Sequence, residues 1–135
     1  MKPFTLQSRM LTMRGVFYPT GYIFVMLPKV EHAEKIAHDL HASGYESQEE
    51  MMLLTPEQIL DNIGRTVRHD DNPLPSVGTE GATVHEYEQL ALQGHCAVMI
   101  HAPSAEATQR VMDVVHTVPF SIAEKYRRLV IEDMP

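Results

Sequence analysis

The sequence contains one cysteine, Cys96, no tryptophan, and no apolar run that approaches the roughly 20 residues of a membrane-spanning helix. A single thiol rules out an internal disulfide framework, and its place inside an apolar run predicts a buried, unreactive side chain. The N-terminal residues carry no apolar core of a secretory signal. We therefore expect a cytoplasmic protein with no membrane partner.

Positive charge is also scarce, since 11 Lys and Arg stand against 18 Asp and Glu, for a formal net charge of −7. This balance disfavours attraction to a phosphate backbone, so a nucleic-acid partner is not expected.

Motifs of metal and cofactor chemistry are missing as well. His85 and Glu86 resemble the start of a zincin helix, but Gln89 stands where the second histidine belongs. His38 and His41 have a spacing that suits one metal ion, yet no cysteine or well-spaced carboxylate completes the set. We predict no metal, no cofactor and no catalytic residue, and we favour a protein that is not an enzyme.

What the chain does contain is a repeat. The segments 21–28 and 94–101 share Gly, Val and Met at a constant offset, and each precedes a stretch with helical periodicity. The first copy predicts a strand over residues 22–27, followed by a helix with Ala33, Ile36 and Leu40 on one face that stops at Gly44. The second predicts a strand over 96–100 and a helix capped at Pro103 and Ser104 and ended by Pro119.

The region between the copies predicts a short strand at 51–54 and two helices. Thr55, Pro56 and Gln58 form a capping-box pattern that opens a helix over 56–63, and helical spacing resumes over 83–93. Residues 65–81 have no apolar period, so we expect a mobile loop there. A last strand is expected within 123–131, most securely at 129–131.

This order predicts an α+β fold: a ferredoxin-like βαβ-(αα insertion)-βαβ sandwich with a four-stranded, mainly antiparallel sheet. A doubly wound parallel sheet is the alternative. We expect residues 1–20 to be an N-terminal extension and approach loop, and 21–135 to be a single domain with a helical insertion at about 55–93.

The two central strands are apolar on both faces. Phe24, Met26, Ala97 and Met99 form one of these faces, and two helices can cover only the other. An open apolar face would promote association, so either the insertion or a second subunit has to cover it. We predict a homodimer.

The candidate binding residues surround the end of the second central strand. His101 closes that strand, where layered α/β folds commonly open a binding site, and Tyr18, Thr20, Glu80 and Tyr126 could join it. The favoured function is a non-catalytic binding or regulatory module for an unknown small ligand or protein partner.

Two other functions stay open. The first is a small dimeric enzyme that uses His101 as base and Tyr126 as donor in a pocket between sheet and helices. The second is RNA binding through the basic cluster from Lys125 to Arg128, although the strand at 96–100 lacks the aromatic residues that stack on bases.

Several segments resemble a group of small, mostly uncharacterised proteobacterial proteins. They are 17–21, 54–58, 78–81, 90–95, 101–103 and 131–133. More distantly, a glycine-led strand, a helix and the ending Gly44-Tyr45 are similar to heat-induced or general stress protein domains. The resemblance implies a bacterial cytosolic domain with a stress association, and it supplies no catalytic residues.

Overall fold

A computed structural model describes residues 1–12, 15–45, 51–68, 79–128 and 130–135. The side chains of residues 68, 79 and 80 also lie outside the description. Most of the predicted mobile loop, the side chain of Glu80 and Leu129 therefore fall outside the described residues.

The described chain forms a mixed α+β fold around one six-stranded sheet with the order β1-β3-β4-β2-β5-β6. Its strands are β1 (Lys2–Pro3), β2 (Tyr22–Leu27), β3 (Met52–Leu54), β4 (Cys96–His101), β5 (Ile122–Tyr126) and β6 (Ile131–Asp133). Only the β1–β3 pair is parallel. The α+β class is confirmed, but the sheet is larger than the four strands predicted.

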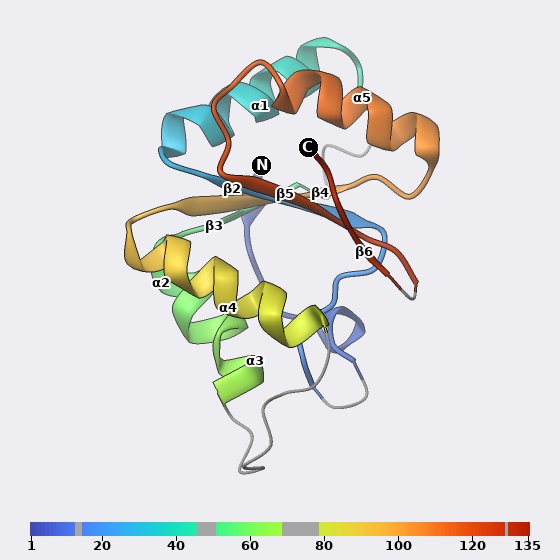
Figure 1. Cartoon of the computed structure of the whole chain (residues 1–135). Helices are drawn as coiled ribbons and strands as arrows, with labels where there is room; N and C mark the ends of the chain where they lie inside the picture. The colour runs from blue at the N-terminus through green and yellow to red at the C-terminus, as the bar shows by residue number, and fades with distance from the viewer. Residues whose placement is uncertain (13–14, 46–50, 69–78, 129) are drawn as a thin grey trace.

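Helices lie on both faces of the sheet (Figure 1). One face carries α1 (Val30–Ala42) and α5 (Ala105–Val115), and the other carries α2 (Pro56–Gln58), a π-helical turn (Ile59–Ile63), α3 (Arg65–Arg68) and α4 (Thr79–Leu92). A short 3-10 turn, Ser8–Met10, belongs to the N-terminal segment. The insertion between β3 and β4 thus forms the second helical layer.

Local sequence explains the main elements. The predicted strand over residues 22–27 matches β2, and every residue of it is buried because β2 lies between β4 and β5 with a helical layer on each side. The capping box at Thr55 is formed, with Oγ1 accepting from the backbone amide of Gln58 and the Gln58 side chain accepting from the amide of Thr55. Ser104 caps α5 by accepting from the amide of Ala107.

The second apolar face, which contains Phe24 and Met99, is covered within the chain. Tyr87 of α4 stacks on Phe24 with ring centroids 4.1 Å apart, and Phe17 of the approach loop meets Phe24 edge to face at 5.7 Å. The insertion and the N-terminal segment supply the rest of this cover. Because the described chain covers this face itself, no open face favours a homodimer, which stays a prediction.

The ends of the chain differ most from expectation. The strand after α5 is β5, at the start of the predicted range 123–131; Leu129 lies outside the described residues, and Ile131 begins β6. The helix α5 ends at Val115, before Pro119. Residues 65–68 and 79–81 are helical rather than part of a loop. The expected N-terminal extension contributes β1, whose pairing with β3 attaches it to the sheet.

Candidate functional site

The structure brings together only some of the predicted site residues. Tyr18 and Tyr126 meet edge to face with ring centroids 5.0 Å apart, and the Tyr18 hydroxyl donates to the carbonyl of Arg127 at 2.6 Å. Thr20 is exposed in the turn before β2. Tyr18 and Tyr126 thus form part of the α4-side core, and neither lines the two hollows described below.

Tyr126 is fully buried, and its hydroxyl lies 2.7 Å from that of Tyr87. Burial, together with the adjacent Tyr126, raises the pKa of Tyr87 well above its usual value. The paired hydroxyls satisfy each other inside an apolar layer, so the geometry assigns Tyr126 a structural role in the core.

His101 is the last residue of β4, and its ring lies 5.1 Å from that of Tyr22 in the neighbouring strand. Its backbone carbonyl accepts a hydrogen bond from the Tyr45 hydroxyl at 2.6 Å. Through this bond Tyr45, which follows the end of α1, is fixed against the end of β4. The strand end chosen from sequence is thus the place where α1, β4 and α5 meet.

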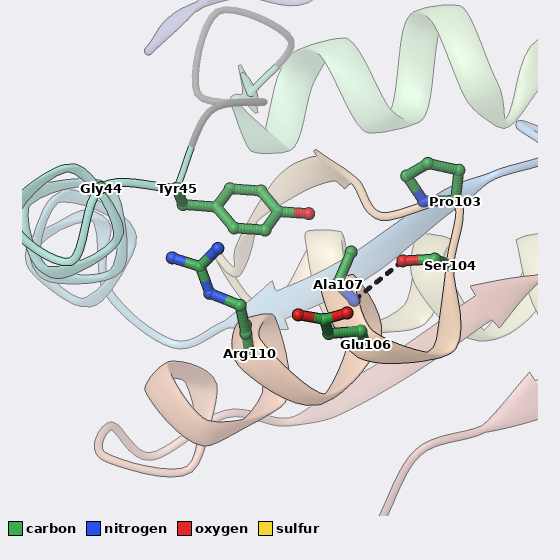
Figure 2. Close-up of a pocket in the computed structure, with 7 residues that line it drawn as sticks. All are labelled: Gly44, Tyr45, Pro103, Ser104, Glu106, Ala107 and Arg110. Atoms are coloured by element: carbon green, nitrogen blue, oxygen red, sulfur yellow. Dashed lines mark hydrogen bonds between the residues drawn. The ribbon is translucent and has the colours of Figure 1, made fainter.

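A hollow of about 260 Å³ opens at this junction (Figure 2). It is lined by Gly44, Tyr45, Pro103, Ser104, Glu106, Ala107 and Arg110. Figure 2 shows the Tyr45 ring beside the Arg110 side chain at one end and Pro103 and Ser104 at the other, with Glu106 between them. We call this site the α1–α5 hollow.

Two interactions hold the Arg110 side chain in place. Its guanidinium carbon lies 5.3 Å from the centroid of the Tyr45 ring, and Nη2 donates to the carbonyl of Ser43 at 3.1 Å. A guanidinium has five N–H donors in a rigid fork, so this anchoring leaves it able to bind a further acceptor. Arg110 is therefore a positioned cation at the edge of the hollow.

Glu106 supplies the opposite charge. It precedes Arg110 by one helical turn, a spacing at which such pairs often join. Among the described residues, Glu106 and Arg110 do not form an ion pair with each other, because Arg110 is turned toward Tyr45 and Ser43 instead. The hollow thus presents separated positive and negative groups.

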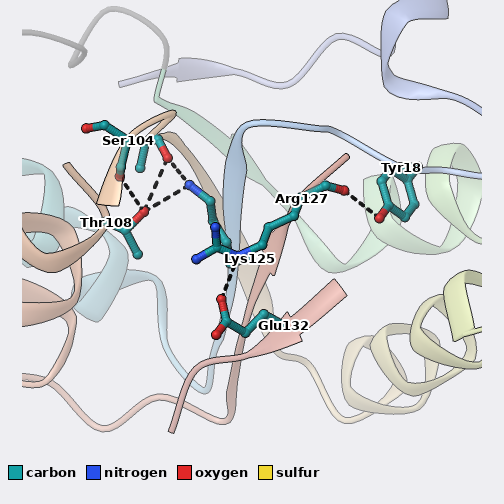
Figure 3. Close-up of polar contacts among 7 residues, drawn as sticks. Tyr18, Ser104, Thr108, Lys125, Arg127 and Glu132 are labelled. Carbon is teal, nitrogen blue, oxygen red and sulfur yellow. Dashed lines mark hydrogen bonds and ion pairs between the residues drawn. The ribbon is translucent and has the colours of Figure 1, made fainter. Parts of the chain in front are cut away.

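Lys125 is hydrogen-bonded at the start of α5, next to residues that line the hollow (Figure 3). Its side chain is buried on the α1/α5 side of the sheet, where the amine donates to the carbonyl of Ala102 and to Thr108 Oγ1. Burial, with a contribution from Arg127, lowers the pKa of this amine. These bonds tie the first turn of α5 to the exit of β4 and so help to position the residues that line the hollow.

The predicted basic cluster is consequently dispersed. Lys125 is buried, Arg127 pairs with Glu132 at 2.7 Å, and Arg128 is exposed. Only two of the three cations face solvent at this edge.

A second hollow of about 260 Å³ lies between α5 and the C-terminal residues. Met112 and Met134 line it together with Arg127, Glu132 and His116. Its charged groups already have partners in the chain, since Arg127 pairs with Glu132 and His116 Nε2 lies 2.9 Å from the carbonyl of Pro135. The α1–α5 hollow is the better candidate because its charges are not paired with each other.

The structure also bears on Cys96, on metal binding and on membrane-spanning helices. Cys96 is buried, and burial raises the pKa of its thiol, so the prediction of an unreactive cysteine is supported. Among the described residues no three His, Cys, Asp or Glu side chains lie together in a group that could hold a metal ion. In the same part of the chain, no helix combines the length and apolar character needed to span a membrane.

None of the predicted site residues whose side chains are described lines the α1–α5 hollow; His101 reaches it through the hydrogen bond that its carbonyl accepts from Tyr45. Tyr45 was noted in the sequence only as part of a glycine-aromatic helix ending, and Arg110 was not a candidate. The available signal was the occurrence of Gly44-Tyr45 after one helix and Pro103-Ser104 before the other. Comparison of the chain with family models, curated proteins and solved structures gave no match.

Proposed function

We propose that this protein is a non-catalytic binding module that holds a small polar ligand in the α1–α5 hollow. The observation that carries the proposal is the anchored Arg110, held on Tyr45 and Ser43 at the edge of a hollow of about 260 Å³. Binding sites combine a concave shape with a few fixed polar groups, as this one does.

The fold supports the same interpretation. We propose that β3-β4-β2-β5, with α1 and α5 on one face, form a ferredoxin-like core that is extended by β1, β6 and the helical insertion. In such a core the ligand would meet the ends of both crossover helices, and its binding would tie them together. A regulatory role follows if that contact alters an interaction with a partner. The bacterial, cytoplasmic and stress-associated setting stays a prediction of the resemblance.

The enzymatic and RNA-binding alternatives gain no observation in their favour. Tyr126, the expected proton donor, is paired with Tyr87 inside the core, and Lys125, the first residue of the expected RNA-binding edge, is buried under α5. Both functions stay predictions.

Arg110→Ala is expected to abolish or strongly weaken ligand binding because it removes the cation at the edge of the hollow, and the protein should stay folded because Arg110 is an exposed residue. A thermal-shift screen of small polar compounds tests this. A ligand at about 100 times its Kd stabilises by about 2.7 kcal/mol, which raises the Tm by several degrees. Arg9→Ala, an exposed arginine outside the hollow, is the control. Equal ligand shifts for the wild type and Arg110→Ala would contradict the proposal.

Subunit composition is tested separately. Because the described chain covers both faces of its own central strands, any homodimer must use another surface. We keep the dimer as a prediction, which size-exclusion chromatography with light scattering checks; a monomer at micromolar concentration would refute it.

A further inference from the structure

The α1–α5 hollow contains one positive and one negative side chain, and this determines which ligands complement it. Arg110 and Glu106 are one turn apart on α5 but are not ion-paired with each other. A simple anion would be attracted by Arg110 and repelled by Glu106, and a simple cation would be repelled by Arg110 and attracted by Glu106. A ligand that carries both charges satisfies both groups.

Charges elsewhere in the chain do not change the preference of the hollow for a ligand that carries both charges. The net charge of −7 repels anions at long range, but at physiological salt the screening length is about 8 Å, so the groups in the hollow dominate. The Lys125 amine donates to Ala102 and Thr108, which do not line the hollow. Among the residues that line the hollow, Arg110 and Glu106 are the charged ones, so the charges of the lining balance.

The size of the hollow suits a small ligand. A volume of about 260 Å³ lies just below the range of pockets that hold drug-sized ligands, and the hollow is open to solvent, so a small molecule fits inside it while a larger one would extend beyond it. The Tyr45 ring and Ala107 add a limited apolar contact for a short side chain.

We infer that the ligand is a small zwitterion of the amino-acid type, a conclusion that rests on the proposed binding function. Its carboxylate pairs with the Arg110 guanidinium, whose planar fork matches carboxylate geometry. Its ammonium group pairs with the Glu106 carboxylate. No bond is formed or broken in this interaction.

Isothermal titration calorimetry with free amino acids at millimolar concentration tests the inference on the full chain. The best-binding amino acid is compared with its N-acetyl derivative, which lacks the positive charge, and with its amide, which lacks the negative charge. We expect each derivative to bind at least about tenfold more weakly, since each leaves one charged group of the hollow without its partner.

Two variants test which charged side chain of the hollow binds which charged group of the ligand. Glu106→Gln is expected to weaken the free amino acid about tenfold and to leave the N-acetyl derivative unchanged, so that it removes the discrimination between them. Arg110→Ala should weaken the free amino acid and the N-acetyl derivative alike. Asp113→Asn, on α5 outside the hollow, is the matched control and should change none of these affinities.

The outcomes separate the two proposals. If N-acetyl amino acids or plain carboxylates bind as tightly as free amino acids, and Arg110→Ala weakens them, the hollow binds anions and the zwitterion inference is wrong. The binding function would then stand. If another small polar compound binds through Arg110 while amino acids do not, the zwitterion inference is likewise wrong and the binding function stands. If no compound binds the wild-type protein, both proposals are wrong.

Discussion

Phe17→Ala is expected to lower the free energy of unfolding by about 3 to 5 kcal/mol, the usual cost of removing a fully buried phenylalanine. Phe17 belongs to the approach loop, is 0% exposed, and lies among the rings of Phe4, Phe24 and Tyr126 at centroid distances of 6.3, 5.7 and 6.0 Å. Its backbone amide also donates to Thr66 Oγ1 in the insertion. The loop therefore joins the N-terminal segment to the insertion across the sheet.

Urea denaturation measures this loss. Leu92→Ala, a truncation at a position that is 68% exposed, is the control and should change stability by less than about 0.5 kcal/mol. Phe17→Leu keeps most of the volume and should lose about 1 kcal/mol, so the effect stays measurable if the alanine variant unfolds. A loss below about 1 kcal/mol for Phe17→Ala would show that the N-terminal segment is not part of the cover over the second face.

Glu124→Gln is expected to stabilise the protein at pH 8 by up to about 3 kcal/mol and to have little effect at pH 4. Glu124 is 8% exposed on β5, directly opposite Phe24 on one side and Asp133 on the other. Burial, with the charges of Asp133 and Glu86, raises the pKa of this carboxyl to about 7. A glutamine imitates the protonated acid and needs no proton.

The sign of the pH dependence follows from the raised pKa. Below the ordinary value of 4.5 the carboxyl is protonated in both the folded and the unfolded chain, and its contribution is fully present. As the pH rises through 4.5 toward 7, the unfolded chain releases the proton first, so the free energy of unfolding falls. Urea titrations at several pH values should show this fall in the wild type and a smaller fall in Glu124→Gln.

The control for this comparison is Glu34→Gln, at an exposed position on α1, which should follow the wild type within about 0.5 kcal/mol at each pH. The same pH dependence in the wild type and Glu124→Gln would refute the assignment of a raised pKa to Glu124. Because the prediction concerns the difference between variants, the titrating groups that do not interact with Glu124 cancel.

Sequence patterns predicted the elements whose residues have a strong local reason to adopt them. The strand β2 follows Gly21, whose φ of +88° is one that glycine adopts readily, and six apolar residues then lie between two covered faces. The capping box at Thr55 is equally local, since its hydrogen bonds join residues three apart.

Elements that depend on distant contacts were harder to predict. β1 consists of Lys2 and Pro3, which form a strand only because β3 lies beside them. β5 contains Glu124 and Lys125 in buried positions, so it shows neither apolar alternation nor a continuous apolar run. Its position is set by pairing with β2, which no local pattern reports.

The candidate site likewise depends partly on local sequence and partly on contacts between distant residues. The end of β4, which was predicted from the sequence, lies beside the hollow, whereas the residues that line the hollow come from the segment after α1, the residues just before α5 and the first turns of α5. Arg110 acquires its role from Tyr45 and Ser43, which lie more than sixty residues earlier in the chain. Spatial proximity of that kind requires the fold.

A titration followed by two-dimensional amide NMR, with the amino acid that binds best, tests the binding site most directly. The account predicts that the largest shift changes occur at the amides of Gly44, Tyr45, Ala107 and Arg110, with saturation at a common Kd. Changes centred instead on Met112 and His116 in the second hollow, or no changes at saturating ligand, would contradict it.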